Sequence, residues 1–237
     1  MKITQKRSIF RDIWRFLTVV FTVHLAFYAP IQAFADAPIY RSEKEHSMQI
    51  ALTFDDGPHP YLTDRIMDIL DQYNAKATFF MVGINVVNYP QAAENVLKRG
   101  HEIGNHTFTH CRAERLSKDA LLQELTRCED ALEELCEYRP HLFRPPEGAL
   151  NGYIQHCSDQ DDYRLILWSI DTRDWEIKNA QQIAKTVLDN VQPGDIILMH
   201  DYIGRGSQTP QALEIILPEL IARGYEPVTV SRLLGFC

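Results

Sequence analysis

From residue 48 onward, short apolar runs alternate with segments that have the apolar spacing of amphipathic helices. Helices are predicted at 61–73, 90–99, 117–135, 150–157, 179–190 and 209–223. Strands are predicted at 48–54, 77–82, 101–104, 142–143, 165–170, 195–199 and 227–230. This alternation predicts a parallel sheet covered by helices. If the sheet closes or nearly closes into a barrel, its chemistry belongs in the loops that follow the carboxyl ends of the strands.

The first 35 residues have the features of a secretory signal peptide. A basic start is followed by an apolar run at 16–31 and by an Ala-x-Ala pattern at 33–35. The alternative is a retained membrane anchor, but sixteen residues are fewer than the roughly 20 that span a bilayer, and Pro30 interrupts them. We therefore expect residues 1–35 to be a signal peptide, 36–47 a lead-in and 48–237 a single domain. The expected location is secreted or periplasmic, or membrane-anchored if the segment is retained.

The charge of the chain disfavours several classes of partner. The whole chain has a formal net charge of −8, and removing residues 1–35 takes away a net +4 and leaves −12. Such a surface repels nucleic acid and anionic lipid, whereas it does not affect a neutral sugar. We therefore expect no nucleic-acid partner, and membrane contact only through the N-terminal segment.

The five cysteines show no C-x-x-C spacing, so a zinc knuckle is not expected. Export permits disulfides, but an odd number leaves at least one thiol unpaired in a monomer, which is the expected state of the chain. Cys128 and Cys136 fall on one predicted helix, about 12 Å apart along its axis. Because a disulfide needs Cα atoms within about 7 Å, these two are expected to be unpaired, buried residues.

Two adjacent carboxylates, Asp55 and Asp56, follow the first strand of the domain and precede Gly57-Pro58. Neighbouring side chains in a strand point to opposite faces, but a bend at the strand end lets them converge. An Asp-Gly turn with solvated acids is the simpler interpretation when this motif is taken alone.

The histidines of Asn105-His-Thr-Phe-Thr-His110 favour a shared site for these carboxylates over a solvated turn. His106 and His110 are four residues apart, a spacing at which two imidazoles can hold one metal ion. With a carboxylate from another strand end they would form a His-His-Asp site with an open position for water. Bound Zn²⁺ lowers the pKa of such a water from 15.7 to about 7, so one aspartate can bind the metal while its neighbour acts as a base.

Three further strand ends carry polar or aromatic residues. Arg144 begins Arg144-Pro-Pro-Glu-Gly148 and could pair with the basic aspartate. The segment 171–175 offers an acid and Trp175, for which core packing is the alternative. His200, at the end of Leu198-Met-His200, is a possible general acid or a capped strand terminus.

In this order, the five motifs resemble those of the polysaccharide deacetylases, the NodB-homology family or carbohydrate esterase family four. The matching motifs are Thr53-Phe-Asp-Asp-Gly-Pro58, His106-Thr-Phe-Thr-His110, Arg144-Pro-Pro-Glu-Gly148, Asp171-Thr-Arg-Asp-Trp175 and Leu198-Met-His200. The resemblance covers residues 48–234. It implies a distorted (β/α)₇ barrel that removes acetyl groups from N-acetylated sugars.

The resemblance also assigns roles to individual residues. Asp55 would be the base, held by Arg144, and His200 the acid that protonates the leaving amine, tuned by Asp174. The implied metal ligands are Asp56, His106 and His110, and the implied substrate contacts are Pro146, Glu147, Trp175 and Leu198. A backbone N–H near Glu147 would help to bind the oxyanion. The implied metal is Zn²⁺, with Co²⁺, Ni²⁺ or Mn²⁺ as alternatives.

Glu147 departs from the family pattern, which usually has an aromatic residue at this position. The backbone donor is kept, but the side chain beside the sugar becomes acidic. The expected substrate is an N-acetylglucosamine-type cell-wall polysaccharide, peptidoglycan first and chitin-like oligomers next. Alternatives are an O-deacetylase of acetylated xylan, a related amide hydrolase, or an inactive sugar-binding protein; the last is disfavoured because the metal and catalytic residues are all present.

Overall fold

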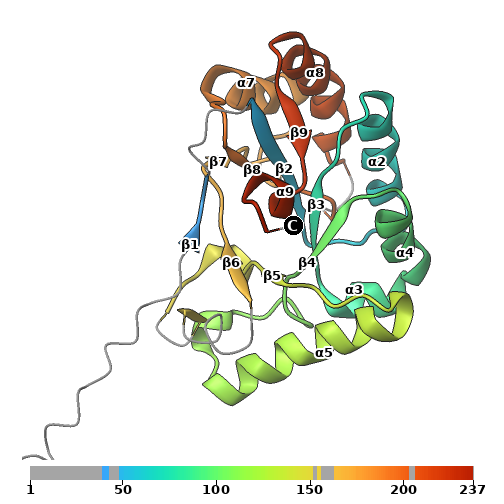
Figure 1. Cartoon of the computed structure of the whole chain (residues 1–237), viewed down its shortest axis with the longest axis vertical. Coiled ribbons are helices and arrows are strands. Elements are labelled where there is room, and N and C mark those ends of the chain that lie inside the picture. Colours follow the sequence, from blue (N-terminus) through green and yellow to red (C-terminus); the bar gives the residue numbers. More distant parts are fainter. Residues whose placement is uncertain (1–38, 43–47, 152–153, 156–162, 203–205, 237) are drawn as a thin grey trace, which may run out of the picture. The chain divides into compact units, whose positions relative to one another are not determined.

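Parallel strands form the centre of the molecule and helices cover their outer side (Figure 1). The computed structural model describes residues 39–42, 48–151, 154–155, 163–202 and 206–236, all within one unit, 36–237. The predicted signal peptide at 1–35 and half of the predicted helix at 150–157 lie outside the described residues. Among the residues that are described, no helix has both the length and the apolar character needed to cross a bilayer.

The described strands number nine and are joined by parallel pairing in the order β1-β6-β5-β4-β3-β2-β8-β7, with β9 also on β2. They are β1 (Ile39–Tyr40), β2 (Gln49–Asp55), β3 (Thr78–Met81), β4 (Glu102–Asn105), β5 (Leu142–Phe143), β6 (Arg164–Ile166), β7 (Ile170–Asp171), β8 (Ile196–His200) and β9 (Glu226–Val228). Each of the seven predicted ranges contains strand structure, although the range 165–170 holds parts of two strands. The short β1, before the domain start predicted at residue 48, was not predicted.

Six of the described helices lie on the outer side of the sheet, where α7, α8, α2 and α4 contact one another in that order and α3 and α5 continue the layer. The short α9 (Val230–Leu233) instead packs with inward-facing residues such as Ala51 and Ile196. The described helices are α2 (Leu62–Gln72), α3 (Gly83–Asn88), α4 (Pro90–Lys98), α5 (Lys118–Cys136), α7 (Ala180–Asn190), α8 (Thr209–Ala222) and α9, with single 3₁₀ turns at Ala113–Arg115 and Pro146–Gly148. The sequence did not predict α3 or α9. Ser117 caps α5 as expected, since its hydroxyl accepts a hydrogen bond from the Ala120 N–H at 3.3 Å.

The strand predicted at 165–170 is two strands, which corrects the prediction. Leu167 N–H donates to Tyr40 O on β1, whereas Ser169 N–H donates to Ile196 O on β8. The segment therefore pairs with β1 before Trp168 and with β8 after it, and these two strands lie near opposite ends of the sheet order. Because β6 and β7 belong to one continuous segment, the sheet curves into a distorted α/β barrel, and this fold class is confirmed.

Alternation along β2 and β8 determines which side chains enter the barrel. Ile50, Leu52 and Phe54 pack in the core under the helices, whereas Ala51 belongs to the inner core. On β8, Ile197 and Met199 face the helices and Ile196 faces inward. Since side chains alternate along a strand, Asp55 and His200 also belong to the inner side, at the carboxyl end of the barrel.

The cysteines agree in part with the sequence analysis. Cys128 and Cys136 are both free, as predicted. Cys128 is fully buried, and burial raises the pKa of its thiol to about 12. Cys136, which was expected to be buried, is only partly buried at the last position of α5.

Candidate active site

A pocket of about 470 Å³ opens at the carboxyl ends of the strands. It is lined by Asp55, Asp56, His106, His110, Glu147, Trp168, Asp171, Trp175, Leu198 and His200. Most of these residues come from loops or strand ends that are far apart in the sequence. The sequence analysis assigned the roles of base, metal ligand or acid to five residues, and all five line this pocket.

Asp55 is held from inside the barrel by a fully buried arginine. Arg144 Nη1 donates to Asp55 Oδ1 at 2.7 Å and to Thr53 Oγ1 at 2.8 Å. The other guanidinium nitrogens donate to backbone carbonyls of Ile166 and Leu167. Every nitrogen of the guanidinium group therefore makes a hydrogen bond, which is the condition under which a buried charge of this kind is tolerated. The ion pair leaves Asp55 Oδ2 directed toward the histidines, 3.9 Å from His106 Nε2.

Asp56 leaves the strand direction, with a left-handed φ of 77° that is uncommon for a residue other than glycine. This turn resolves how two neighbouring carboxylates can serve one pocket. The next residue must be glycine, because a Cβ at Gly57 would lie 2.2 Å from Asp201 Oδ2. The buried Asp201 carboxylate, which the sequence analysis did not identify, thus packs directly beneath the turn.

Asp56, His106 and His110 form a cluster whose ligand atoms all lie within 4.8 Å of one another. Asp56 Oδ1 is 3.4 Å from His106 Nε2 and 3.0 Å from His110 Nε2. Two ligands at about 2.1 Å from a tetrahedral zinc ion are separated by about 3.4 Å, so the spacing suits a metal ion.

The ring of His106 is oriented in a way that also fits metal binding. His106 Nδ1 lies 2.7 Å from Arg144 O, and because a carbonyl only accepts, this nitrogen carries the proton and donates. The lone pair is then on Nε2, toward Asp56. A backbone carbonyl that orients a histidine in this way is a common feature around metal ligands.

The electrostatics of the cluster favour an ionised aspartate. Burial opposes the charge of Asp56, but hydrogen bonds with His106 and His110 and the charges of the nearby histidines hold its pKa well below the usual range. The hydrogen bond with Asp56 in turn raises the pKa of His110. An anionic oxygen between two imidazoles is a suitable donor set for Zn²⁺.

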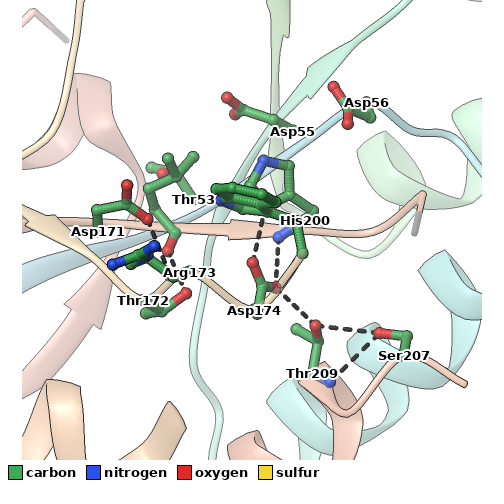
Figure 2. A network of polar contacts seen from close by, with 12 residues as sticks. Thr53, Asp55, Asp56, Asp171, Thr172, Arg173, Asp174, His200, Ser207 and Thr209 are labelled. Atoms are coloured by element: carbon green, nitrogen blue, oxygen red, sulfur yellow. Dashed lines mark hydrogen bonds and ion pairs between the residues drawn. The ribbon is translucent and has the colours of Figure 1, made fainter. Parts of the chain in front are cut away.

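His200 is anchored by Asp174, as Figure 2 shows. Asp174 Oδ1 accepts from His200 Nδ1 at 2.7 Å, and Oδ2 accepts from the His200 backbone N–H at 2.9 Å and from Thr209 Oγ1 at 2.6 Å. Burial alone would lower the pKa of His200, but the hydrogen bond and charge of Asp174, with the charges of Asp55 and Asp56, raise it to about 9. His200 Nε2 is left as the nitrogen available to the pocket.

The predicted substrate contacts fall into two groups. Trp175, Leu198 and Glu147 line the pocket. Trp175 is 51% exposed, so core packing, the alternative for this residue, is wrong. Pro146 is buried and is not among the pocket-lining residues, so its substrate contact stays a prediction.

Glu147 occupies a strained turn at the rim of the pocket. Its φ is 59°, and its carboxylate lies 3.5 Å from Arg112 Nη2 in an exposed ion pair. The acidic side chain that replaces the usual aromatic residue is therefore partly neutralised by a neighbouring cation.

Trp168 and Asp171 line the pocket but had not been predicted as substrate contacts. Trp168 lies where the barrel segment changes partners, and its ring is 5.6 Å from the Arg144 guanidinium carbon. A tryptophan inside a predicted apolar strand gives no sign in the sequence that it faces a pocket.

A parallel α/β barrel with a polar pocket at the carboxyl ends of its strands is the arrangement of barrel enzymes. Residues 42–166 match the family model for polysaccharide deacetylase. The chain is 43% identical over 189 residues to a peptidoglycan-N-acetylglucosamine deacetylase of Bacillus cereus, covering 79% of this chain and 88% of that protein. The chain belongs to the polysaccharide deacetylase family, which confirms the resemblance.

Two further comparisons agree with this assignment. The chain is 38% identical over 184 residues to the peptidoglycan-N-acetylmuramic acid deacetylase PdaC of Bacillus subtilis, covering 78% of this chain but only 38% of that longer protein. A crystal structure of a peptidoglycan N-acetylglucosamine deacetylase, in complex with 4-naphthalen-1-yl-N-oxidanyl-benzamide, superposes with a TM-score of 0.80 at 34% identity, covering 82% of this chain and 92% of that one.

Proposed function

We propose that this protein is an exported, divalent-metal-dependent hydrolase that removes N-acetyl groups from the N-acetylglucosamine residues of peptidoglycan. The observation that carries this proposal is that an arginine-held Asp55, the Asp-His-His cluster and an aspartate-held His200 line one pocket. The names of the two relatives support peptidoglycan as the glycan.

Asp56, His106 and His110 would hold the ion, with Zn²⁺ as the proposed metal. When bound, such an ion supplies a water molecule of lowered pKa next to the acetyl group. A set of three protein ligands would leave one position of a four-coordinate zinc ion open, as in catalytic rather than structural zinc sites.

Amide hydrolysis needs two proton transfers, and two different side chains, Asp55 and His200, would carry them out. Asp55, which is fixed by Arg144, takes a proton from the attacking water while the water oxygen forms a bond to the acetyl carbon. His200, protonated at neutral pH by its raised pKa, gives a proton to the amine nitrogen as the carbon–nitrogen bond breaks. The products are acetate and a glucosamine residue. Asp174 keeps the imidazole oriented throughout.

The aromatic and apolar walls would receive the substrate. Leu198 is 4% exposed and forms a closed side of the pocket, which suits the methyl of an acetyl group. Trp175 and Glu147 are both pocket-lining and largely exposed, so they would contact the sugar rather than the acetyl group.

Export rests on the N-terminal sequence. The basic start, the apolar run at 16–31 and the Ala-x-Ala pattern at 33–35 support cleavage after residue 35. N-terminal sequencing of the protein recovered from culture medium or periplasm tests this part; an intact Met1 in the recovered protein would contradict cleavage.

The experiment that tests the activity is acetate release from purified protein on three substrates: peptidoglycan, chitooligosaccharides and acetylxylan. Peptidoglycan is expected to give the highest kcat/KM. A preference for acetylxylan would show instead that the protein is an O-deacetylase. If no acetate is released from any of the three substrates with zinc present, the protein would be better described as an inactive sugar-binding protein.

A further inference from the structure

The turn that carries the two site aspartates is held by hydrogen bonds to three consecutive carbonyl groups. Asp55 O accepts from the Asp201 backbone N–H at 3.1 Å, and Gly57 O accepts from the Val82 backbone N–H at 2.8 Å. Between them, Asp56 O accepts from Asn85 Nδ2 at 2.8 Å. Of these three bonds, only the one from Asn85 is made by a side chain.

The carbonyl held by Asn85 belongs to the residue with the unfavourable backbone conformation. Asp56 has a φ of 77°, and left-handed conformations of residues other than glycine persist where the surrounding structure holds them in place. Rotation of this peptide would move the Asp56 carboxylate relative to both histidines. The position of Oδ1 thus depends on contacts to the backbone of Asp56 as well as on the imidazoles.

The helix that supplies Asn85 is also joined to the histidine segment. Gly83 N–H donates to Thr107 O at 3.0 Å, and Ile84 N–H donates to Phe108 O at 2.9 Å. A Cβ at Gly83 would meet the Phe108 ring at 2.5 Å, so the two segments are in close contact. α3 is therefore bonded to the loop between His106 and His110 and, through Asn85, to Asp56.

We propose that Asn85 is a positioning residue for the metal site: its amide fixes the Asp56 peptide relative to the histidine loop and so sets the distance between the aspartate and imidazole ligands. This inference rests on the proposed function. Asn85 is not among the pocket-lining residues, so it acts through Asp56 and without contact to the substrate. The sequence analysis predicted no helix at 83–88 and did not single out Asn85.

The test compares zinc affinity of metal-free wild-type protein and variants, measured by titration against a competing chelator. Asn85→Ala is expected to bind zinc 10- to 100-fold more weakly, the range typical of partners that orient ligands. Its kcat for acetate release should fall by a comparable factor while KM is unchanged. Asn85→Asp keeps the shape but replaces the donor by an acceptor, and should lose at least as much affinity.

The matched control is Asn95→Ala. Asn95 lies on the adjacent helix α4, and its amide donates to Asp64 Oδ1 at 3.2 Å, away from the pocket. Its zinc affinity and kcat should stay at wild-type values. Thermal unfolding of each variant shows whether it is folded, and if Asn85→Ala is not, the isosteric Asn85→Asp carries the test.

Either of two results would overturn the inference alone: wild-type zinc affinity in a folded Asn85→Ala or Asn85→Asp, or an equal loss in Asn95→Ala. Wild-type protein that binds no divalent ion would instead overturn the proposed function, and the inference with it.

Discussion

Asp55 and His200 occupy paired positions on the adjacent parallel strands β2 and β8. Both are last residues of their strands and both have the inward orientation. Each is then held by a buried partner from a different part of the chain, Asp55 by Arg144 and His200 by Asp174. The barrel thus presents a carboxylate and an imidazole side by side, the carboxylate paired with a buried cation and the imidazole with a buried anion.

The first prediction concerns Asp55 as the base. Asp55→Asn should lower kcat by about 10²- to 10⁴-fold, the range that general-base catalysis contributes, because an amide does not take up the proton. Zinc content should be unchanged, since the proposed ligands are Asp56, His106 and His110. Acetate release and elemental analysis of the same sample measure both. Turnover within a factor of ten of wild type would exclude Asp55 as the base.

The second prediction concerns the buried ion pair. Arg144→Met should reduce the free energy of unfolding by about 3–5 kcal/mol, because it leaves the Asp55 carboxylate buried without its cation. Urea denaturation with a linear extrapolation measures this change. The exposed pair of Arg139 and Glu133 is the control: Arg139→Met should reduce the free energy of unfolding far less, because solvent screens this pair. Similar losses in the two variants would contradict a special role for the buried pair.

The third prediction is the titration of His200 in metal-free protein. Asp174 and the neighbouring carboxylates outweigh burial and raise its pKa from 6.5 to about 9, so NMR should show the imidazole protonated at pH 7. Because the folded pKa is the higher one, this interaction stabilises the fold fully below pH 6.5 and is lost as the pH rises through 9. Its size is on the order of 3 kcal/mol.

The control for that titration is Asp174→Asn. The variant removes the charge that holds the imidazolium, so the pKa of His200 should fall toward or below 6.5, and kcat at neutral pH should fall with it. A His200 pKa that is the same in both proteins would show that Asp174 does not tune the acid.

The fourth prediction concerns removal of the metal. Dialysis against a chelator should abolish acetate release, and added zinc should restore it. Far-UV circular dichroism should stay unchanged, because the proposed ligands lie in loops after the strand ends and are not part of the described apolar core. Zinc at 100 times its Kd should raise the free energy of unfolding by about 2.7 kcal/mol. Full activity of protein shown by elemental analysis to be metal-free would contradict the scheme.

The fifth prediction concerns Glu147. Glu147→Tyr should lower KM for neutral chitooligosaccharides about 2- to 10-fold, since an aromatic ring adds roughly 0.5–1.5 kcal/mol of contact. The value of kcat should change little, because the backbone of the turn stays in place. Glu147→Gln separates charge from ring: if it lowers KM as much as Tyr does, the effect is due to the lost charge. A large fall in kcat with either variant would place Glu147 in the chemical step.

Sequence periodicity predicted most of the elements because strands and helices differ in the spacing of their apolar residues. It failed where tertiary pairing decides the outcome. The run at 165–170 is apolar except for Ser169, but its first half pairs with β1 and its last residue with β8, near opposite ends of the sheet order, so it divides at Trp168. The helix α3 has only six residues, too few for an amphipathic pattern to be recognised.

The amino-acid sequence alone determined the chemistry that is available: two adjacent carboxylates, histidines four apart, and an arginine and a further histidine, each at a predicted strand end. Those features are local, so the order of residues is enough to find them. Only the tertiary structure decided which groups hold them in place, such as Asn85 on the Asp56 carbonyl and Asp201 beneath Gly57. These contacts join segments far apart in the chain, and their existence depends on closing the barrel, which no local pattern encodes.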